Sequence, residues 1–201
     1  MKMAKKFLAV ALAGVLALSV LTGCGASVKS KDIADALTKM GVKVEQDKDM
    51  DKTAEETLAA IEAVVNAPAN AAKPDTDTSK ITLDNAVNDT TGKIIKRSTI
   101  TNSPNAAIAK ILGLYETSDG TAQNENISKN VKVALVKIEN ATKDASLQAA
   151  LVKDGLAVVC NRTPSGTKVY AESGKLGSAK TSDGKYILVV IVTDLVEKTN
   201  A

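Results

Sequence analysis

The sequence predicts an α+β fold in which short helices pack on a mainly antiparallel sheet formed by the C-terminal half. One observation is helical periodicity. In residues 32–40 apolar side chains recur at i, i+3, i+4 and i+7, which places them on one face of a helix. The other is the run YILVVIV at residues 186–192, which has no polar alternation. Such a run is typical of a central strand that is covered on both faces.

The N-terminal residues 1–23 have the three parts of an export signal. Lys2, Lys5 and Lys6 form a positive start, and Phe7–Val20 is an uncharged stretch of 14 residues. This stretch is shorter than the roughly 20 residues that span a bilayer as a helix. We therefore expect a cleaved signal peptide rather than a membrane span.

The signal ends at the stretch Leu21-Thr22-Gly23-Cys24, in which small residues precede a cysteine. It resembles the lipobox of bacterial lipoproteins, and the resemblance covers residues 1–24. The resemblance implies cleavage before Cys24 and a diacylglyceryl group on the Cys24 thiol, with acyl chains such as palmitate. Two acyl chains hold a protein firmly on a membrane, whereas one holds it marginally. The alternative is an ordinary secretory signal that a cysteine follows by chance.

We expect five segments along the chain. They are a signal peptide at residues 1–23, a lipidated cysteine and short tether at residues 24–30, an N-terminal helical pair at residues 31–66, a linker or long loop at residues 67–79, and an α+β domain at residues 80–201. The loop assignment depends on the sequence APANAAKPDTDTS, which is rich in small, polar and proline residues. Within the helical pair, Gly41 is predicted to end the first helix. A capping box of Thr53 and Glu56 predicts the start of the second.

Three aspartates precede this second helix. Asp47, Asp49 and Asp51 match the D-x-D-x-D start of a calcium loop. However, Lys52 stands where that loop has glycine, and Leu58 stands where it has a bidentate glutamate. The sequence therefore predicts an exposed acidic turn and no metal site.

In residues 80–201, helices are expected to start at Ser103-Pro104 and at Asp144, and glycines at positions 113 and 155 to end them. Residues 131–138 favour a strand, with a helix as the open alternative. Strands are also expected around residues 81–83 and 94–100 and at residues 156–160, 167–171 and 186–192, whereas residues 173–181, which contain glycine and lysine, are predicted as a loop.

The composition excludes several chemistries. The chain has no histidine, so it cannot build a Ser-His-Asp triad, a Cys-His pair or a histidine zinc site. It has three tyrosines, one phenylalanine and no tryptophan, which leaves no stacking platform for nucleic acid. The net charge of +3 resides in the three lysines of the signal, so the remainder is neutral and not attracted to nucleic acid. Cys160 ends an apolar run and is expected to be a small buried side chain.

The sequence thus predicts a lipid-anchored extracytoplasmic protein, on the cell membrane or on an outer membrane where one exists, with a non-enzymatic binding or envelope-assembly role. Its expected partners are the membrane, through the lipid on Cys24, and an envelope protein or wall polymer. No cofactor is expected. One alternative is a cell-envelope hydrolase that uses carboxylates or a serine–lysine pair, for which Ser165 and Lys168 match the S-x-x-K pattern. The other is a small solute-binding lipoprotein.

Overall fold

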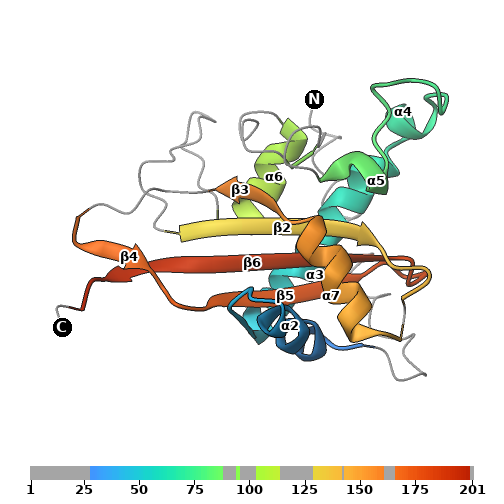
Figure 1. The fold of residues 1–201 in the computed structure, drawn as a ribbon. Coiled ribbons are helices and arrows are strands. Elements are labelled where there is room, and N and C mark those ends of the chain that lie inside the picture. The colour runs from blue at the N-terminus through green and yellow to red at the C-terminus, as the bar shows by residue number, and fades with distance from the viewer. Residues whose placement is uncertain are drawn as a thin grey trace.

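The computed structural model describes residues 28–87, 94–95, 103–113, 129–141, 143–160 and 166–199. Within them the chain forms, in order, α2 (Ser30–Lys39), β1 (Val44–Gln46), α3 (Lys48–Val65), α4 (Pro68–Ala71), α5 (Leu83–Ala86), α6 (Ser103–Ile111), β2 (Lys129–Lys137), α7 (Ala145–Asp154), β3 (Ala157–Cys160), β4 (Lys168–Tyr170), β5 (Gly174–Lys180) and β6 (Tyr186–Glu197). The strands form one sheet in the order β1-β5-β6-β2-β3, and β4 pairs with β6 (Figure 1). Only the β1–β5 pair is parallel among these strands. The predicted α+β class with a mainly antiparallel C-terminal sheet is confirmed.

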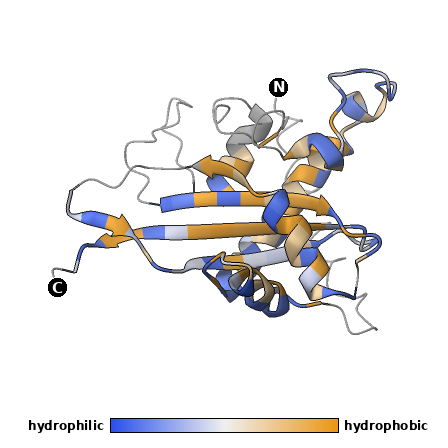
Figure 2. Cartoon of the chain, viewed as in Figure 1, coloured by the Kyte–Doolittle hydropathy of each residue, from blue (hydrophilic) through white to orange (hydrophobic). Residues whose placement is uncertain are grey.

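Strand β6 is the centre of the sheet and separates two cores. Alternate side chains of β6 face α2 and α7 on one side and α3 and α6 on the other (Figure 1). The buried side chains that face α2 and α7 are Ile187, Val189 and Ile191. Those that face α3 and α6 are Leu188, Val190 and Val192. Figure 2 shows the resulting apolar band along β6 and β2. The prediction that residues 186–192 form a strand covered on both faces is therefore confirmed.

The N-terminal helices lie on opposite faces of the sheet. Helix α2 contributes Ile33 and Leu37 to one core, and α3 contributes Leu58 and Ile61 to the other. Strand β1 connects the two helices at the edge of the sheet. Residues 31–66 and residues 80–201 therefore share both cores.

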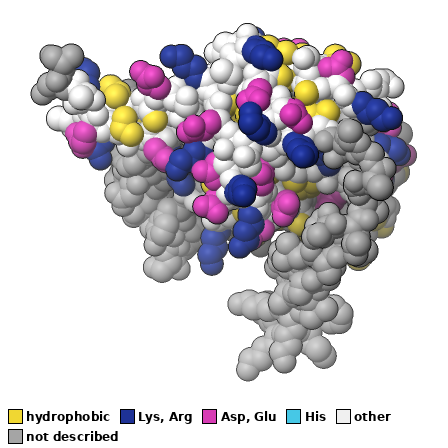
Figure 3. Space-filling model, turned by 90° about the horizontal axis from the view of Figure 1, so that it is seen from below, with side chains coloured by type: hydrophobic (Ala, Val, Ile, Leu, Met, Phe, Trp, Pro, Cys, Tyr) yellow, Lys and Arg dark blue, Asp and Glu magenta, His cyan; other side chains and the backbone are white. Residues whose placement is uncertain are grey.

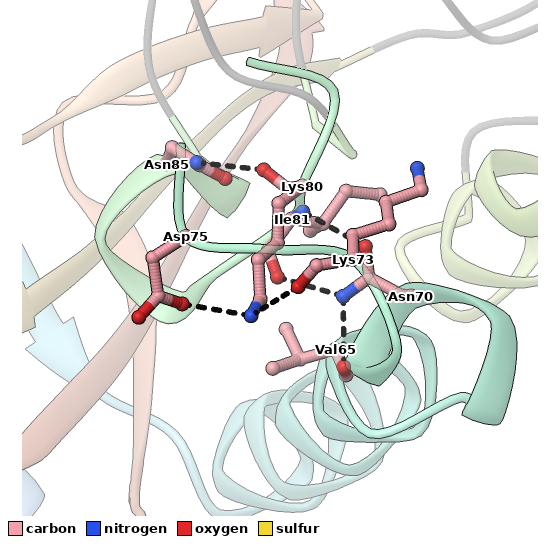
Figure 4. A network of polar contacts seen from close by, with 7 residues as sticks. All are labelled: Val65, Asn70, Lys73, Asp75, Lys80, Ile81 and Asn85. Carbon is pink, nitrogen blue, oxygen red and sulfur yellow. Dashed lines mark hydrogen bonds and ion pairs between the residues drawn. The ribbon is translucent and has the colours of Figure 1, made fainter. Parts of the chain in front are cut away.

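The connection at residues 67–79 contains α4 and is held by Asn70, which is 7% exposed. The Asn70 amide donates to the carbonyls of Val65 and Ile81, each at 2.8 Å, and its oxygen accepts from the Ile81 N–H at 2.9 Å (Figure 4). Lys80 Nζ adds bonds to the Lys73 carbonyl and to Asp75, each at 2.8 Å. One buried amide thus fixes both ends of this loop.

Helix α3 begins six residues before the predicted start, because its N-cap is Asp47 and not Thr53. The Asp47 carboxylate accepts from the N–H groups of Asp49 and Met50. The Thr53 hydroxyl, predicted as the cap, instead donates to the Asp49 carbonyl one turn earlier. The predicted acidic turn is thus wrong, because carboxylates near a helix N-terminus satisfy unpaired N–H groups and favour the helix dipole.

The predicted loop at residues 173–181 is also wrong, because residues 174–180 form β5, which lies between β1 and β6. Its composition reflects close packing against α3. A Cβ atom at Gly177 would lie 1.9 Å from the backbone of Met50. Small residues are needed here, and they hide the apolar alternation that usually indicates a strand.

Other elements follow the predictions more closely. Residues 129–137 form a strand rather than the alternative helix, and Asp144 caps α7 by accepting from the Leu147 N–H at 2.9 Å. Gly41 and Gly113 follow α2 and α6 with φ of +87° and +64°, values that favour glycine. Around residue 83 a short helix, α5, replaces the expected strand, and residues 88–93 and 96–102 lie outside the described residues.

Beyond β5, strand β4 and the end of β6 form a projecting two-stranded ribbon (Figure 1). The ribbon is defined as residues 168–170 and 195–197. Tyr170 pairs with Leu195, whereas Lys175 pairs with Val192, so two extra residues bulge between β4 and β5. Val196 on this ribbon is 43% exposed. The ribbon therefore carries an apolar side chain away from both cores.

Candidate functional site

The predicted lipidation site, Cys24, lies outside the described residues, which begin at Val28. Val28 packs against the core formed by α2, α7 and the sheet. Its carbonyl accepts a hydrogen bond from Lys180 Nζ at 3.0 Å. The chain is thus fixed to the folded part four residues after Cys24.

Lys180 is the last residue of β5, and its half-buried amine points toward this N-terminal chain. Burial lowers the pKa of Lys180 below its usual value, and Asp32 partly offsets the effect. Sequence reasoning missed Lys180 because it falls in the predicted loop. The alternation of Leu176, Ser178 and Lys180 on one face of the strand is the signal that could have indicated it.

The start of α2 is attached at the same place. The hydroxyls of Ser30 and Ser178 share a hydrogen bond of 2.8 Å. The Asp32 carboxylate accepts from the Lys29 N–H at 2.9 Å. Together with Lys180, these contacts determine where the N-terminal chain leaves the domain.

A depression of about 510 Å³ lies between α2 and β1, lined by Lys31, Asp35, Thr38, Lys39, Val44, Glu45 and Gln46. The Asp35 carboxylate pairs with Lys31 Nζ at 2.6 Å, and the two side chains are 54% and 69% exposed. The hydrogen bond that Lys31 Nζ donates to Asp35 raises the pKa of Lys31. The depression is thus an open, polar surface of mixed charge, without the apolar enclosure that shifts the pKa of a catalytic acid.

A second group of carboxylates surrounds the turn between β5 and β6. Burial raises the pKa of Glu62 on α3, and the charge of Asp183 raises it further. Hydrogen bonds from the Thr181 hydroxyl, at 2.6 Å, and from the Lys185 N–H, at 3.1 Å, lower the pKa of Asp183. The two carboxyl groups therefore differ in acidity because Glu62 is half-buried, whereas Asp183 is exposed and accepts hydrogen bonds.

Tyr186 lies beside this group. Its hydroxyl donates to Asp84 Oδ1 at 2.8 Å and so connects the start of β6 to α5. Partial burial, together with this bond and the charge of Asp84, raises the pKa of Tyr186 to about 12. The phenol is thus a hydrogen-bond donor at neutral pH.

Several sequence candidates do not converge on one site. Asp47 and Asp51 are used in capping and in bonds to β5, and no cluster of three or more potential ligands able to hold a metal occurs within the described residues. Ser165 lies outside the described residues, and Lys168 lies in β4 within 4.0 Å of Glu197. Cys160 ends β3 opposite Val131, and its side chain lies outside the described part.

In the part of the chain that the structure describes, no helix combines the length and apolar character required to cross a membrane. Comparison with protein-family models, with curated proteins and with solved structures found no match to this chain.

Proposed function

We propose that this protein is a cell-envelope lipoprotein, anchored by a diacylglyceryl group on Cys24 on the extracytoplasmic side, with a non-enzymatic binding or assembly role. The observation that carries the proposal is the stretch Leu21-Thr22-Gly23-Cys24 at the end of an export signal. The folded part starts by Val28, which suits a domain held close to the membrane.

The non-enzymatic role is supported by the chemistry of the chain. It has no histidine, and the carboxylates of the α2–β1 depression lie in an open surface. Three of the ion pairs, Lys31–Asp35, Lys137–Glu139 and Lys185–Asp183, are well exposed on both partners. Such pairs contribute little to stability and leave a polar surface for contact with a protein or a wall polymer.

Lipidation is tested in the full chain, made in a bacterial host that is supplied with an alkyne analogue of palmitate. The wild-type chain and the Cys160→Ala control should carry the label and enter the detergent phase on partitioning. The Cys24→Ala variant should lose both properties and keep its signal peptide. An unlabelled wild-type chain, or a mature N-terminus at another residue by mass spectrometry, would contradict the proposal.

The binding role is tested by thermal unfolding with muropeptides and wall-polymer fragments. A ligand at a hundred times its dissociation constant stabilises a protein by about 2.7 kcal/mol. Cross-linking on intact cells examines protein partners. Hydrolysis of any of these substrates by the purified protein would contradict the non-enzymatic role.

The alternative is a carboxylate-dependent envelope hydrolase, for which Glu62 and Asp183 are the carboxyl groups to test. This function requires that Glu62→Gln and Asp183→Asn each abolish turnover of a glycan substrate while the folded state persists. The solute-binding alternative would use the α2–β1 depression of about 510 Å³, which is open and polar. Thermal shifts with small metabolites test that function.

A further inference from the structure

We infer that the bilayer lies against one end of the sheet, here called the hairpin end: Val28, Lys180, the β5–β6 connection at residues 181–185, and the start of α7. The ribbon at residues 168–170 and 195–197 then points away from the membrane. This inference rests on the proposed lipidation of Cys24. The partner of the hairpin end is a lipid headgroup surface.

The first argument is the length of the tether. Val28 is the fourth residue after Cys24, and an extended chain over these four steps spans at most about 14 Å. Val28 is held by its carbonyl bond to Lys180 and by packing on the core. The bilayer surface must therefore lie close to the end of β5.

The second argument is the length of the sheet. Lys180 pairs with Ile187 at the start of β6, whereas the ribbon comprises the other end of the same strand. From Tyr186 to Glu197 a strand extends by about 37 Å. A tether of about 14 Å cannot reach the membrane from Val28 if the ribbon faces the bilayer. Figure 1 shows the C-terminal ribbon at the left end of the sheet and the β5–β6 connection at its right end.

The third argument is the distribution of exposed side chains. Among the described residues the exposed large hydrophobic side chains are Leu147, at 45%, and Val196, at 43%. Leu147 lies in the first turn of α7, next to the loop where the Ile138 N–H donates to the Lys185 carbonyl. Each end of the sheet thus carries one exposed apolar side chain, and Leu147 is the one at the hairpin end that headgroups can bury.

The side of the molecule along α2 has no exposed large hydrophobic side chain among the described residues. Figure 3 shows acidic and basic side chains interspersed on this face. The pair Lys31–Asp35 is exposed there, and contact with lipid would desolvate it. The hairpin end carries the exposed pairs Lys137–Glu139 and Lys185–Asp183 as well, so the short tether and the length of the sheet, not these charges, favour it.

The experiment uses the full lipidated chain with Cys160→Ala, reconstituted in vesicles of phosphatidylethanolamine and phosphatidylglycerol that contain a headgroup-labelled acceptor lipid. A donor dye is placed at Ser182→Cys or at Thr199→Cys, two matched exposed hydroxyl positions. Energy transfer from position 182 should be at least about twofold stronger, because about 37 Å of strand separates the two ends. Equal transfer from both positions, or stronger transfer from position 199, would overturn the inference.

Two controls separate this result from the proposed function. If the chain carries no lipid, both dyes stay off the vesicles, and the proposed function fails. In a variant with about 20 glycine and serine residues inserted between Ser27 and Val28, the difference should shrink, because such a tether spans about 25 Å. If the difference in energy transfer between positions 182 and 199 stays the same in this variant, the short tether is not the cause of the orientation.

Discussion

The Asp51 carboxylate accepts a hydrogen bond from the Ser178 backbone N–H at 3.1 Å, beyond the point where β1 ends. Strand β1 pairs with β5 as far as Leu176, whose carbonyl accepts from the Asp47 N–H. The chain then turns into α3, and the next outward N–H of β5 is that of Ser178. A side chain from the first turn of a helix thus satisfies a group that a longer strand would have paired.

Replacement of Asp51 by alanine should destabilise the fold by about 1–3 kcal/mol, because it leaves the Ser178 N–H without a partner. The change also removes the 2.6 Å bond from Gln46 Nε2 to Asp51. Denaturant unfolding of a soluble form that starts at Gly25 measures the difference. Asp51→Asn is the matched control: it keeps an oxygen for Ser178 and should cost less than about 1 kcal/mol. Equal losses in both variants would show that the carboxylate charge matters more than this bond.

Gly177→Ala should destabilise the protein by about 3 kcal/mol or more, because the backbone of α3 must move to admit the methyl group. The added Cβ atom would lie 1.9 Å from the carbonyl carbon and oxygen of Met50. The control is Gly166→Ala, where a Cβ atom has no neighbour within 4 Å. Thermal unfolding should show a large loss for the first variant and little change for the second. A small loss at Gly177 would mean that α3 does not rest directly on β5.

The same glycine explains why β5 was missed while β6 was predicted. The apolar run at residues 186–192 identifies β6 from local composition alone. Strand β5 is defined by its neighbours: Gly177 admits α3, and Ser178 bonds to Ser30 and Asp51. Small and polar residues that serve such tertiary contacts have the same composition as a loop, so a short sequence window predicts a loop.

The candidate sites also differ in whether a local stretch of sequence can predict them. Lipidation is predicted from four consecutive residues that end at Cys24, because the signal is local. The contact of Lys180 with Val28 joins residues 152 positions apart, and the influence of Asp183 on Glu62 also depends on the assembled fold. No spacing within the sequence indicates either pair.

Glu62→Gln should stabilise the protein at neutral pH by a few tenths of a kcal/mol, a small effect because the side chain is only half-buried. Burial and Asp183 raise the pKa of Glu62 above its usual 4.5, so the folded state disfavours the ionised form. The wild-type chain thus loses stability as the pH rises from about 4.5 through the folded pKa. The glutamine variant should lack this loss.

Unfolding measured at several pH values tests this effect. The gain of Glu62→Gln should disappear below about pH 4.5, where the carboxyl group is protonated in both states. Glu55→Gln, a change on the exposed side of the same helix, is the matched control for the substitution itself. A stabilising effect of equal size at every pH would exclude the titration of Glu62 as its origin.

Tyr186→Phe should remove the last tyrosine step in an ultraviolet absorbance titration, since the pKa of Tyr186 is about 12. In the wild-type protein the phenol keeps its proton when folded but releases it near pH 10 when unfolded. Stability should therefore fall as the pH rises from about 10 to 12, and the variant should lack this part of the decline. At neutral pH the variant should lose about 1 kcal/mol, because Asp84 loses its hydrogen bond. Tyr170→Phe is the control and should keep the absorbance step near pH 12. If Tyr170→Phe loses this step, the step does not belong to Tyr186.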